Sequence, residues 1–158
     1  MHERTLRGDE ADRRRAVSAL YYALFHRLCA TGAAIFATGG PQLQLKSARA
    51  FNHGPMAQVC TLYVASGRRG QFVSELAWHP AGSPSAGIVA VASAFIQLQQ
   101  ARHLADYDLA AELSAVEHLH LLFIAENAHW QLDRMQGADE LMILVSTMLL
   151  HDRWKRNG

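Results

Sequence analysis

The sequence predicts an all-α protein, an antiparallel bundle of about five helices. Apolar residues recur at intervals of three and four along most of the chain, which is the period of one helix face. No stretch alternates between apolar and polar residues for long enough to predict a strand. Half of the 158 residues are hydrophobic and 18% are charged, so the chain can bury a packed core. At this length we expect one domain covering residues 1–158.

The first predicted helix begins near Glu10 and runs until Gly39-Gly40-Pro41 stops it. A second helical region is split at His53-Gly54-Pro55, with Pro55 in the first turn of the continuation, where a proline loses no needed hydrogen bond. The apolar face of the first helix consists of Val17, Leu20, Tyr21, Leu24 and Leu28.

A loop-rich stretch, residues 67–84, precedes the third predicted helix, and Ser83 before Pro84 is its expected cap. This helix ends within residues 101–109, ARHLADYDL. Ser114 and Glu117 have capping-box spacing, which predicts a fourth helix running to about Arg134. The last helix carries an apolar stripe of the same period, Leu141, Leu144, Val145, Met148 and Leu149.

The charges divide the chain into a basic and an acidic half. No acidic residue lies between Asp12 and Glu75. The stretch from Glu75 to Glu140 contains nine acidic residues and only two basic ones, Arg102 and Arg134. The basic half either contacts phosphate or pairs with the acidic half within the fold or across a dimer. The basic residues between Asp12 and Glu75 are Arg13, Arg14, Arg15, Arg27, Lys46, Arg49, Arg68 and Arg69.

Several classes of protein are disfavoured by composition. Cys29 and Cys60 lie in apolar stretches without metal-type spacing, and we expect both to be small buried hydrophobes. The charged N-terminus is unlike a secretory signal, and the longest apolar run, Gly87 to Ile96, is about half the roughly 18 residues that span a bilayer. We therefore expect a soluble, cytoplasmic protein.

Arg102 is unusual by position, because it continues the apolar face of Val91, Phe95 and Leu98. A half-buried guanidinium is costly unless it is paired, and Asp106 stands one turn further along at i+4. The pair either stabilises the helix end or holds the arginine ready to bind a phosphate with two hydrogen bonds.

Two Glu-x-x-His pairs have the spacing of metal ligands, but the sequence does not favour a metal site. Glu117 with His120, and Glu126 with His129, have the Glu-x-x-His spacing of helical di-iron proteins. Those sites require the two motifs on different helices, whereas both motifs lie here on one predicted helix. Neither a metal nor another cofactor is predicted.

Residues 15–26, RAVSALYYALFH, resemble the "RAYYAxFH" helix of HEPN-domain proteins, the higher eukaryotes and prokaryotes nucleotide-binding family. Residues 102–108, RHLADYD, resemble the "RxxADYD" motif of a prokaryotic branch of that family. Residues 50–54, AFNHG, and 149–153, LLHDR, fit the same pattern, so the resemblance covers most of the chain in the right order.

The resemblance implies a HEPN-like helical bundle that forms a homodimer and brings polar motifs of two subunits together. Many HEPN proteins are metal-independent endoribonucleases, often toxins or defence proteins, with an Arg-x4–6-His motif. Others bind a nucleotide or RNA without known cleavage, and several pair with a nucleotidyltransferase antitoxin. The sequence leaves both functions open, an endoribonuclease or a non-catalytic module that binds a nucleotide or such a partner.

Carried over residue by residue, Arg102 matches the motif arginine, and Tyr107 stands where the nuclease histidine would stand. Metal-free RNA cleavage needs a base, an acid and a cation for the phosphorane charge. Tyrosine is a plausible acid but a poor base, so His103 is a candidate base and Asp106 would orient the arginine. Neighbouring side chains point about 100° apart on a helix, so the site requires a helix end at residues 106–108 or a second subunit.

Three further residues are candidate substrate-binding groups. Tyr22, His26 and His53 would line the polar groove that the resemblance implies. Each also has a structural interpretation, because tyrosines in this helix pack into a core with bonded hydroxyls and buried histidines are commonly hydrogen-bonded.

Overall fold

The all-α prediction is confirmed. The computed structural model describes residues 2–108, 110 and 112–157, and within these residues every regular element is a helix. Six α-helices are present there where about five were predicted, because the second predicted region forms two separate helices. They are α1 (His2–Phe36), α2 (Pro41–Ala48), α3 (His53–Arg69), α4 (Ala86–Tyr107), α5 (Ala115–Arg134) and α6 (Asp139–Asn157), with one 3-10 turn, η1 (Ser74–Leu76).

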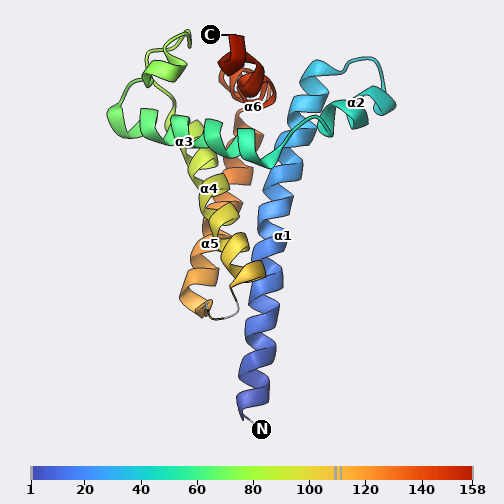
Figure 1. Cartoon of the computed structure of the whole chain (residues 1–158), viewed down its shortest axis with the longest axis vertical. Helices are drawn as coiled ribbons and strands as arrows, with labels where there is room; N and C mark the ends of the chain where they lie inside the picture. Colours follow the sequence, from blue (N-terminus) through green and yellow to red (C-terminus); the bar gives the residue numbers. More distant parts are fainter. Residues whose placement is uncertain (1, 109, 111, 158) are drawn as a thin grey trace.

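The helices form an antiparallel bundle. The direction of α4 is opposite to that of α1 and of α5, and both helices pack along it (Figure 1). The helix α3 crosses one end of the α1–α4 pair, and α6 packs against α3, α1 and α4. This arrangement places the start of α3 beside the middle of α1 and the C-terminal half of α4 beside the N-terminal half of α1.

One hydrophobic core joins these elements. The predicted apolar positions Val17, Tyr21, Leu24 and Leu28 of α1 are fully buried. They meet buried residues of α3, η1, α4, α5 and α6 in a continuous cluster. The predicted faces of the third and last helices are buried as well, through Val91, Phe95, Leu98, Leu141, Leu144, Val145 and Met148.

Several helix boundaries differ from the predicted ones. The helix α1 begins at His2 rather than near Glu10 and ends at Phe36. Gly40 has φ of 112°, a left-handed conformation that glycine adopts readily, and it lets Pro41 begin α2. The second region is interrupted at residues 49–52 instead of at His53-Gly54-Pro55, so Pro55 lies in the first turn of α3 as predicted.

The predicted N-cap of α4 is wrong, and the predicted capping box of α5 is confirmed. Ser85, not Ser83, caps α4 and accepts a hydrogen bond from the backbone N–H of Ile88. The Ser114–Glu117 capping box is confirmed, with both reciprocal hydrogen bonds present. The helix α4 ends at Tyr107, within the segment where a helix end was expected.

The charged halves of the chain meet within the fold. Arg27 of α1 pairs with Asp133 of α5, with 2.5 Å between Nη2 and Oδ1. The Nε of Arg13 donates to the carbonyl of Leu113, and Arg14 Nη1 donates to the carbonyl of Ala105. Part of the basic half therefore makes contacts within the fold, which is one of the two interpretations of the charge pattern.

Both cysteines are buried and free, as predicted. The expectation about membrane spans needs a correction. Although no continuous apolar run is long enough, one helical segment, Asp9–Phe36, reaches the length and mean hydropathy of a possible span. In the bundle, 39% of its most apolar window is buried, and the core helix of a soluble protein passes the same test.

Candidate functional site

Polar and aromatic residues converge where α1, α3 and α4 meet. We call this group the Arg102 cluster. It contains all seven residues proposed from the sequence and three that the sequence analysis did not select. From α1 come Ser18, Tyr21, Tyr22 and His26; from α3 comes His53; from α4 come Gln99, Arg102, His103, Asp106 and Tyr107.

The predicted Arg102–Asp106 ion pair is confirmed. Arg102 Nε lies 2.8 Å from Asp106 Oδ2, and the arginine side chain is 23% exposed. The other carboxylate oxygen of Asp106 accepts a hydrogen bond of 2.7 Å from the hydroxyl of Ser18. Asp106 thus connects α4 to α1 and fixes the direction in which the guanidinium points.

Aromatic rings from two helices surround the guanidinium. Its central carbon lies 5.2 Å from the ring centroid of Tyr22, 5.8 Å from that of Tyr21 and 5.9 Å from that of Tyr107. These distances allow cation–π attraction. Burial alone would lower the pKa of Arg102, but the neighbouring Tyr22 and Asp106 outweigh it and raise that pKa. Arg102 therefore stays charged at every physiological pH.

The guanidinium retains unused donors. Its Nε faces Asp106, and within the described residues neither η nitrogen has a hydrogen-bond acceptor. An arginine held by a carboxylate at one edge and open at the other can bind an anionic oxygen with two parallel hydrogen bonds. The site therefore has the donor geometry that phosphate recognition requires.

A chain of hydrogen bonds fixes His53. Gln99 Nε2 approaches the hydroxyl of Tyr21 at 3.5 Å, and that hydroxyl lies 2.5 Å from Nδ1 of His53. Burial raises the pKa of Tyr21 to about 12, so the phenol keeps its proton and its O–H donates a hydrogen bond to Nδ1. The hydrogen of neutral His53 is then on Nε2, which makes this nitrogen a donor.

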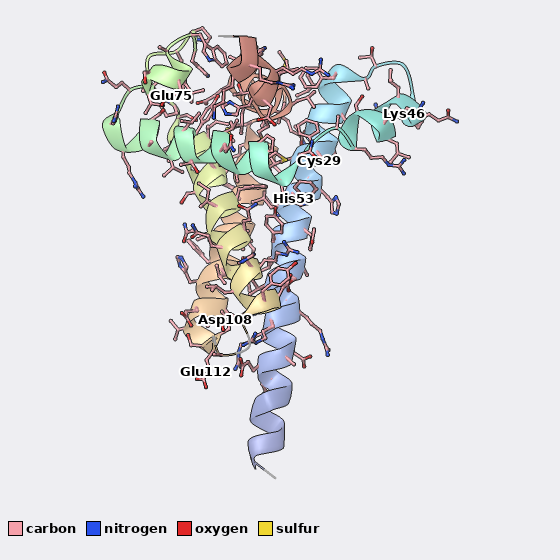
Figure 2. All side chains as sticks on the ribbon, in the orientation of Figure 1. Cys29, Lys46, His53, Glu75, Asp108 and Glu112 are labelled. Carbon is pink, nitrogen blue, oxygen red and sulfur yellow. The ribbon has the colours of Figure 1, made fainter. Side chains whose placement is uncertain are left out.

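His53 is held neutral by its surroundings. Its ring stacks on Phe25 with 3.9 Å between centroids, and burial together with the nearby charges of Arg102 and His26 lowers its pKa. Figure 2 shows His53 at the junction of α3 and α1. His26 belongs to the same aromatic group, because its ring stacks on Tyr22 at 6.1 Å.

The two remaining predicted residues lie at the open edge. The rings of His103 and Tyr107 are 4.9 Å apart on the last turns of α4, and both side chains are exposed. Arg102 and His103 also line a surface hollow of about 480 Å³. The end of α4 therefore brings Tyr107 close to Arg102 within one chain, without a second subunit.

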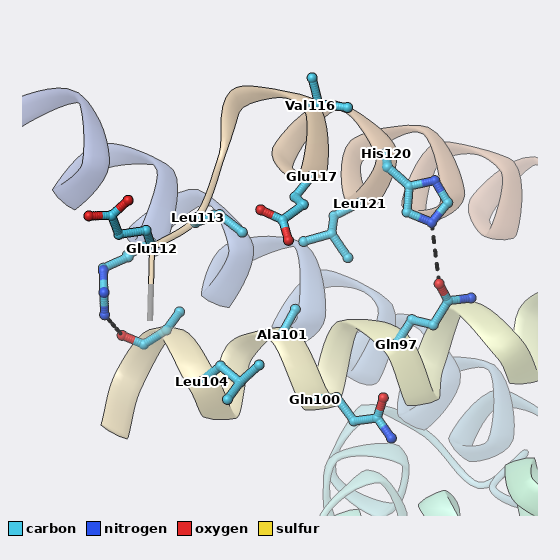
Figure 3. Close-up of a pocket in the computed structure, with 12 residues that line it drawn as sticks. Gln97, Gln100, Ala101, Leu104, Glu112, Leu113, Val116, Glu117, His120 and Leu121 are labelled. Atoms are coloured by element: carbon cyan, nitrogen blue, oxygen red, sulfur yellow. Dashed lines mark hydrogen bonds between the residues drawn. The ribbon is translucent and has the colours of Figure 1, made fainter. Parts of the chain in front are cut away.

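A second hollow lies behind the cluster, between α4 and α5, and has a volume of about 580 Å³ (Figure 3). Apolar side chains such as Leu104, Val116 and Leu121 face it from the two helices. His120 reaches across its rim and hydrogen-bonds Oε1 of Gln97 at 3.3 Å. Arg14 closes the other end, where it contacts the carbonyl of Ala105.

The Glu-x-x-His pairs do not form a metal centre in this structure. Glu117 is engaged in the capping box with Ser114, and His120 is bonded to Gln97. Throughout the part of the chain that the structure describes, no group of three or more His, Cys, Asp or Glu side chains is placed to hold a metal ion.

Ser18, Gln99 and the hydroxyl of Tyr21 are the members of the cluster that the sequence analysis did not select. Ser18 lies within the RAVSALYYALFH segment, and Gln99 lies three residues before Arg102, so both positions were visible as neighbours of selected residues. Their partners lie 88 and 78 residues away in the sequence, and no local spacing reveals such pairs.

The chain was compared with protein-family models, curated proteins and solved structures, and no match was found.

Proposed function

We propose that this chain is a HEPN-like protein that binds RNA at the Arg102 cluster and cleaves it without a metal ion. One observation carries this proposal: a charged guanidinium with unused donors lies at the surface among imidazole and phenol groups from three helices. Those groups are the chemical types that bind a phosphodiester and move protons around it. The sequence resemblance to HEPN proteins supports the same interpretation.

Each side chain has a role in the proposed reaction. Arg102 binds the non-bridging oxygens of the scissile phosphate, and Asp106 positions it through the ion pair at Nε. His53, with its hydrogen on Nε2, donates a hydrogen bond to the phosphate, while Tyr22 and His26 contact the adjoining nucleotide. His103 takes the proton of the 2′-hydroxyl, and Tyr107 gives a proton to the leaving 5′-oxygen.

We further propose that the protein acts as a cytoplasmic homodimer of the toxin or defence type. An apolar stripe on α5 supports dimerisation, because its large side chains are exposed in the single chain. The stripe consists of Val116, Leu119, Phe123 and Trp130. A nucleotidyltransferase antitoxin is the alternative occupant of this face.

The test is RNA cleavage by the purified protein in the presence of EDTA, with Arg102→Ala and Tyr107→Phe as variants. We expect Arg102→Ala to lower the cleavage rate by about 100- to 1,000-fold, as the loss of one transition-state donor does. Tyr107→Phe shows whether its hydroxyl is the acid. Arg49→Ala, which removes an exposed arginine of the short α2–α3 connection, is the matched control and is expected to cleave normally.

The second candidate is a non-catalytic module that binds a nucleotide or a partner protein. It is favoured by Tyr107 in the histidine position and by the engagement of His53 Nδ1 with Tyr21, which removes one imidazole as a base. A folded wild-type protein that binds RNA but cleaves none of several RNAs would establish this candidate. RNA binding that is unaffected by Arg102→Ala would reject the Arg102 cluster as the RNA-binding site in either case.

A further inference from the structure

A second aromatic site lies outside the Arg102 cluster. Trp78, which follows η1, and Trp154 of α6 meet with their ring centroids 5.2 Å apart and their planes at 76°. The two residues are 50% and 42% exposed, although tryptophan is highly buried on average. They line a groove of about 900 Å³ between α3, η1 and α6, which we call the Trp groove.

Charged side chains line the Trp groove from two elements. Lys155 of α6 is the cation that lines it within the described residues, and the imidazole of His151 lies on the same helix. The only acid that lines it within the described residues is Glu75, whose carboxylate accepts a hydrogen bond of 2.9 Å from the Ser74 hydroxyl. Hydrogen bonds from its own backbone and from Ser74, together with the charge of Arg69, lower the pKa of Glu75. Arg69 therefore offsets the negative charge at this edge.

The Trp groove is separate from the Arg102 cluster. The two share no residue: Gln58, Thr61 and Leu62 line the groove from the middle of α3, whereas His53 of the Arg102 cluster begins α3 and lies well away from Glu75 (Figure 2). His53 and Thr61 are eight residues apart on α3, a rise of about 12 Å along the helix axis, so one extended single strand of a few nucleotides can reach from one region to the other. The polar side chains of Gln58 and Thr61 lie on the α3 side of the groove and offer hydrogen bonds to a ligand.

We propose that the Trp groove binds single-stranded RNA by stacking a nucleobase on Trp78 and Trp154 while Lys155 contacts the adjoining phosphate. Exposed aromatic faces beside basic side chains are the combination by which proteins hold single strands without reading their sequence. A cationic ligand, which two tryptophans also attract, is disfavoured because Lys155 repels it and Arg69 opposes the charge of Glu75. The inference shares its ligand class with the proposed function but depends on different residues.

The experiment measures binding of a short fluorescein-labelled oligo(A) whose 2′-hydroxyls are methylated, so that cleavage cannot interfere. Fluorescence anisotropy gives Kd for the full-length protein and its variants. Trp78→Ala and Trp154→Ala are expected to weaken binding by about 5- to 100-fold, the usual cost of losing one base–aromatic stack. Trp154→Phe, which keeps an aromatic face, is expected to recover most of the affinity, which a merely structural role would not require.

Two controls separate this site from other effects. Phe36→Ala removes an aromatic side chain at the end of α1 that is 43% exposed and lies outside the groove, and it should leave Kd unchanged. Lys155→Ala should reduce the slope of log K against log salt concentration by about 0.7, as expected for one lost phosphate contact to a single strand. Unchanged Kd in folded Trp78→Ala and Trp154→Ala proteins, or an equal loss in Phe36→Ala, overturns the inference.

The same assay distinguishes failure of this inference from failure of the proposed function. Binding that is lost in Arg102→Ala but unchanged in the groove variants rejects the Trp groove alone. Binding that is weakened in the groove variants but unchanged in Arg102→Ala supports the Trp groove and rejects the proposed function.

Discussion

The Arg102 cluster and the Trp groove are built in opposite ways. In the cluster, a charged group is held by fixed neighbours: Asp106 pairs with the guanidinium, and Ser18 fixes Asp106 from another helix. In the groove, two large rings meet at the surface and leave much of their area open to solvent. A polar site therefore needs a supporting set of hydrogen-bonded and charged partners, whereas a stacking surface needs only an exposed ring in place.

The support of the cluster reaches the centre of the bundle. Tyr21, whose hydroxyl holds His53, is fully buried, and its ring lies 5.5 Å from that of Phe95. Phe95 is also fully buried and belongs to the core shared by five helices. The groove side chain Trp154 instead lies near the end of α6, where its neighbours in the helix are exposed. Stability should therefore respond very differently to truncation in the two regions.

The largest expected effect is on the free energy of unfolding of Phe95→Ala. Removing a fully buried phenylalanine leaves a cavity and costs about 3–5 kcal/mol. Trp154→Ala, which truncates a larger but half-exposed side chain, should cost clearly less. Chemical denaturation followed by circular dichroism measures both. An equal cost for the two variants would show that the Trp groove is part of the core and would remove the contrast.

The same contrast explains what the sequence could predict. Helix periodicity, the Ser114–Glu117 capping box and the Arg102–Asp106 spacing are local patterns, and each of them is present in the structure. The error at the α4 cap is also local: Ser83 and Ser85 both flank Pro84, and only the backbone geometry selects Ser85. A pattern that lies within one helix turn can be predicted from the sequence.

Contacts between segments that are distant in the sequence could not be predicted from it. Trp78 and Trp154 are separated by 75 intervening residues, and nothing in their local sequence signals that they meet. The Ser18–Asp106 bond has the same character, because it depends on how α1 and α4 pack. The resemblance to HEPN proteins proposed which residues belong together, but the positioning groups depend on packing that spacing does not encode.

A smaller effect is expected for Tyr21→Phe. The change removes the hydroxyl that holds Nδ1 of His53 and leaves that nitrogen without its donor, so we expect a loss of about 0.5–1.5 kcal/mol in stability. The neighbouring Tyr22→Phe is the matched control, since the Tyr22 hydroxyl makes no hydrogen bond to the described residues. If both variants lose the same stability, the Tyr21–His53 bond does not support the cluster.

The smallest effect concerns two histidines, one beside each region. Burial lowers the pKa of both His53 and His79; the charges of Arg102 and His26 lower that of His53 further, whereas Glu140 opposes the shift at His79. A histidine whose pKa is lower in the folded state binds fewer protons there than in the unfolded chain. Its stabilisation is therefore complete above the unfolded pKa of about 6.5 and is lost as the pH falls toward the folded pKa.

Arg102→Ala separates the two histidines. Without the guanidinium charge, the pKa of His53 should rise toward its ordinary value, while the pKa of His79 should not change. In the variant, the pKa of His53 differs less between the folded and unfolded chains. Its free energy of unfolding should therefore fall less than that of the wild type as the pH drops below 6.5. Histidine ring protons followed by NMR across a pH titration measure both pKa values directly. A parallel shift of His79 would mean that the substitution alters the whole bundle, and the two regions would then not be independent.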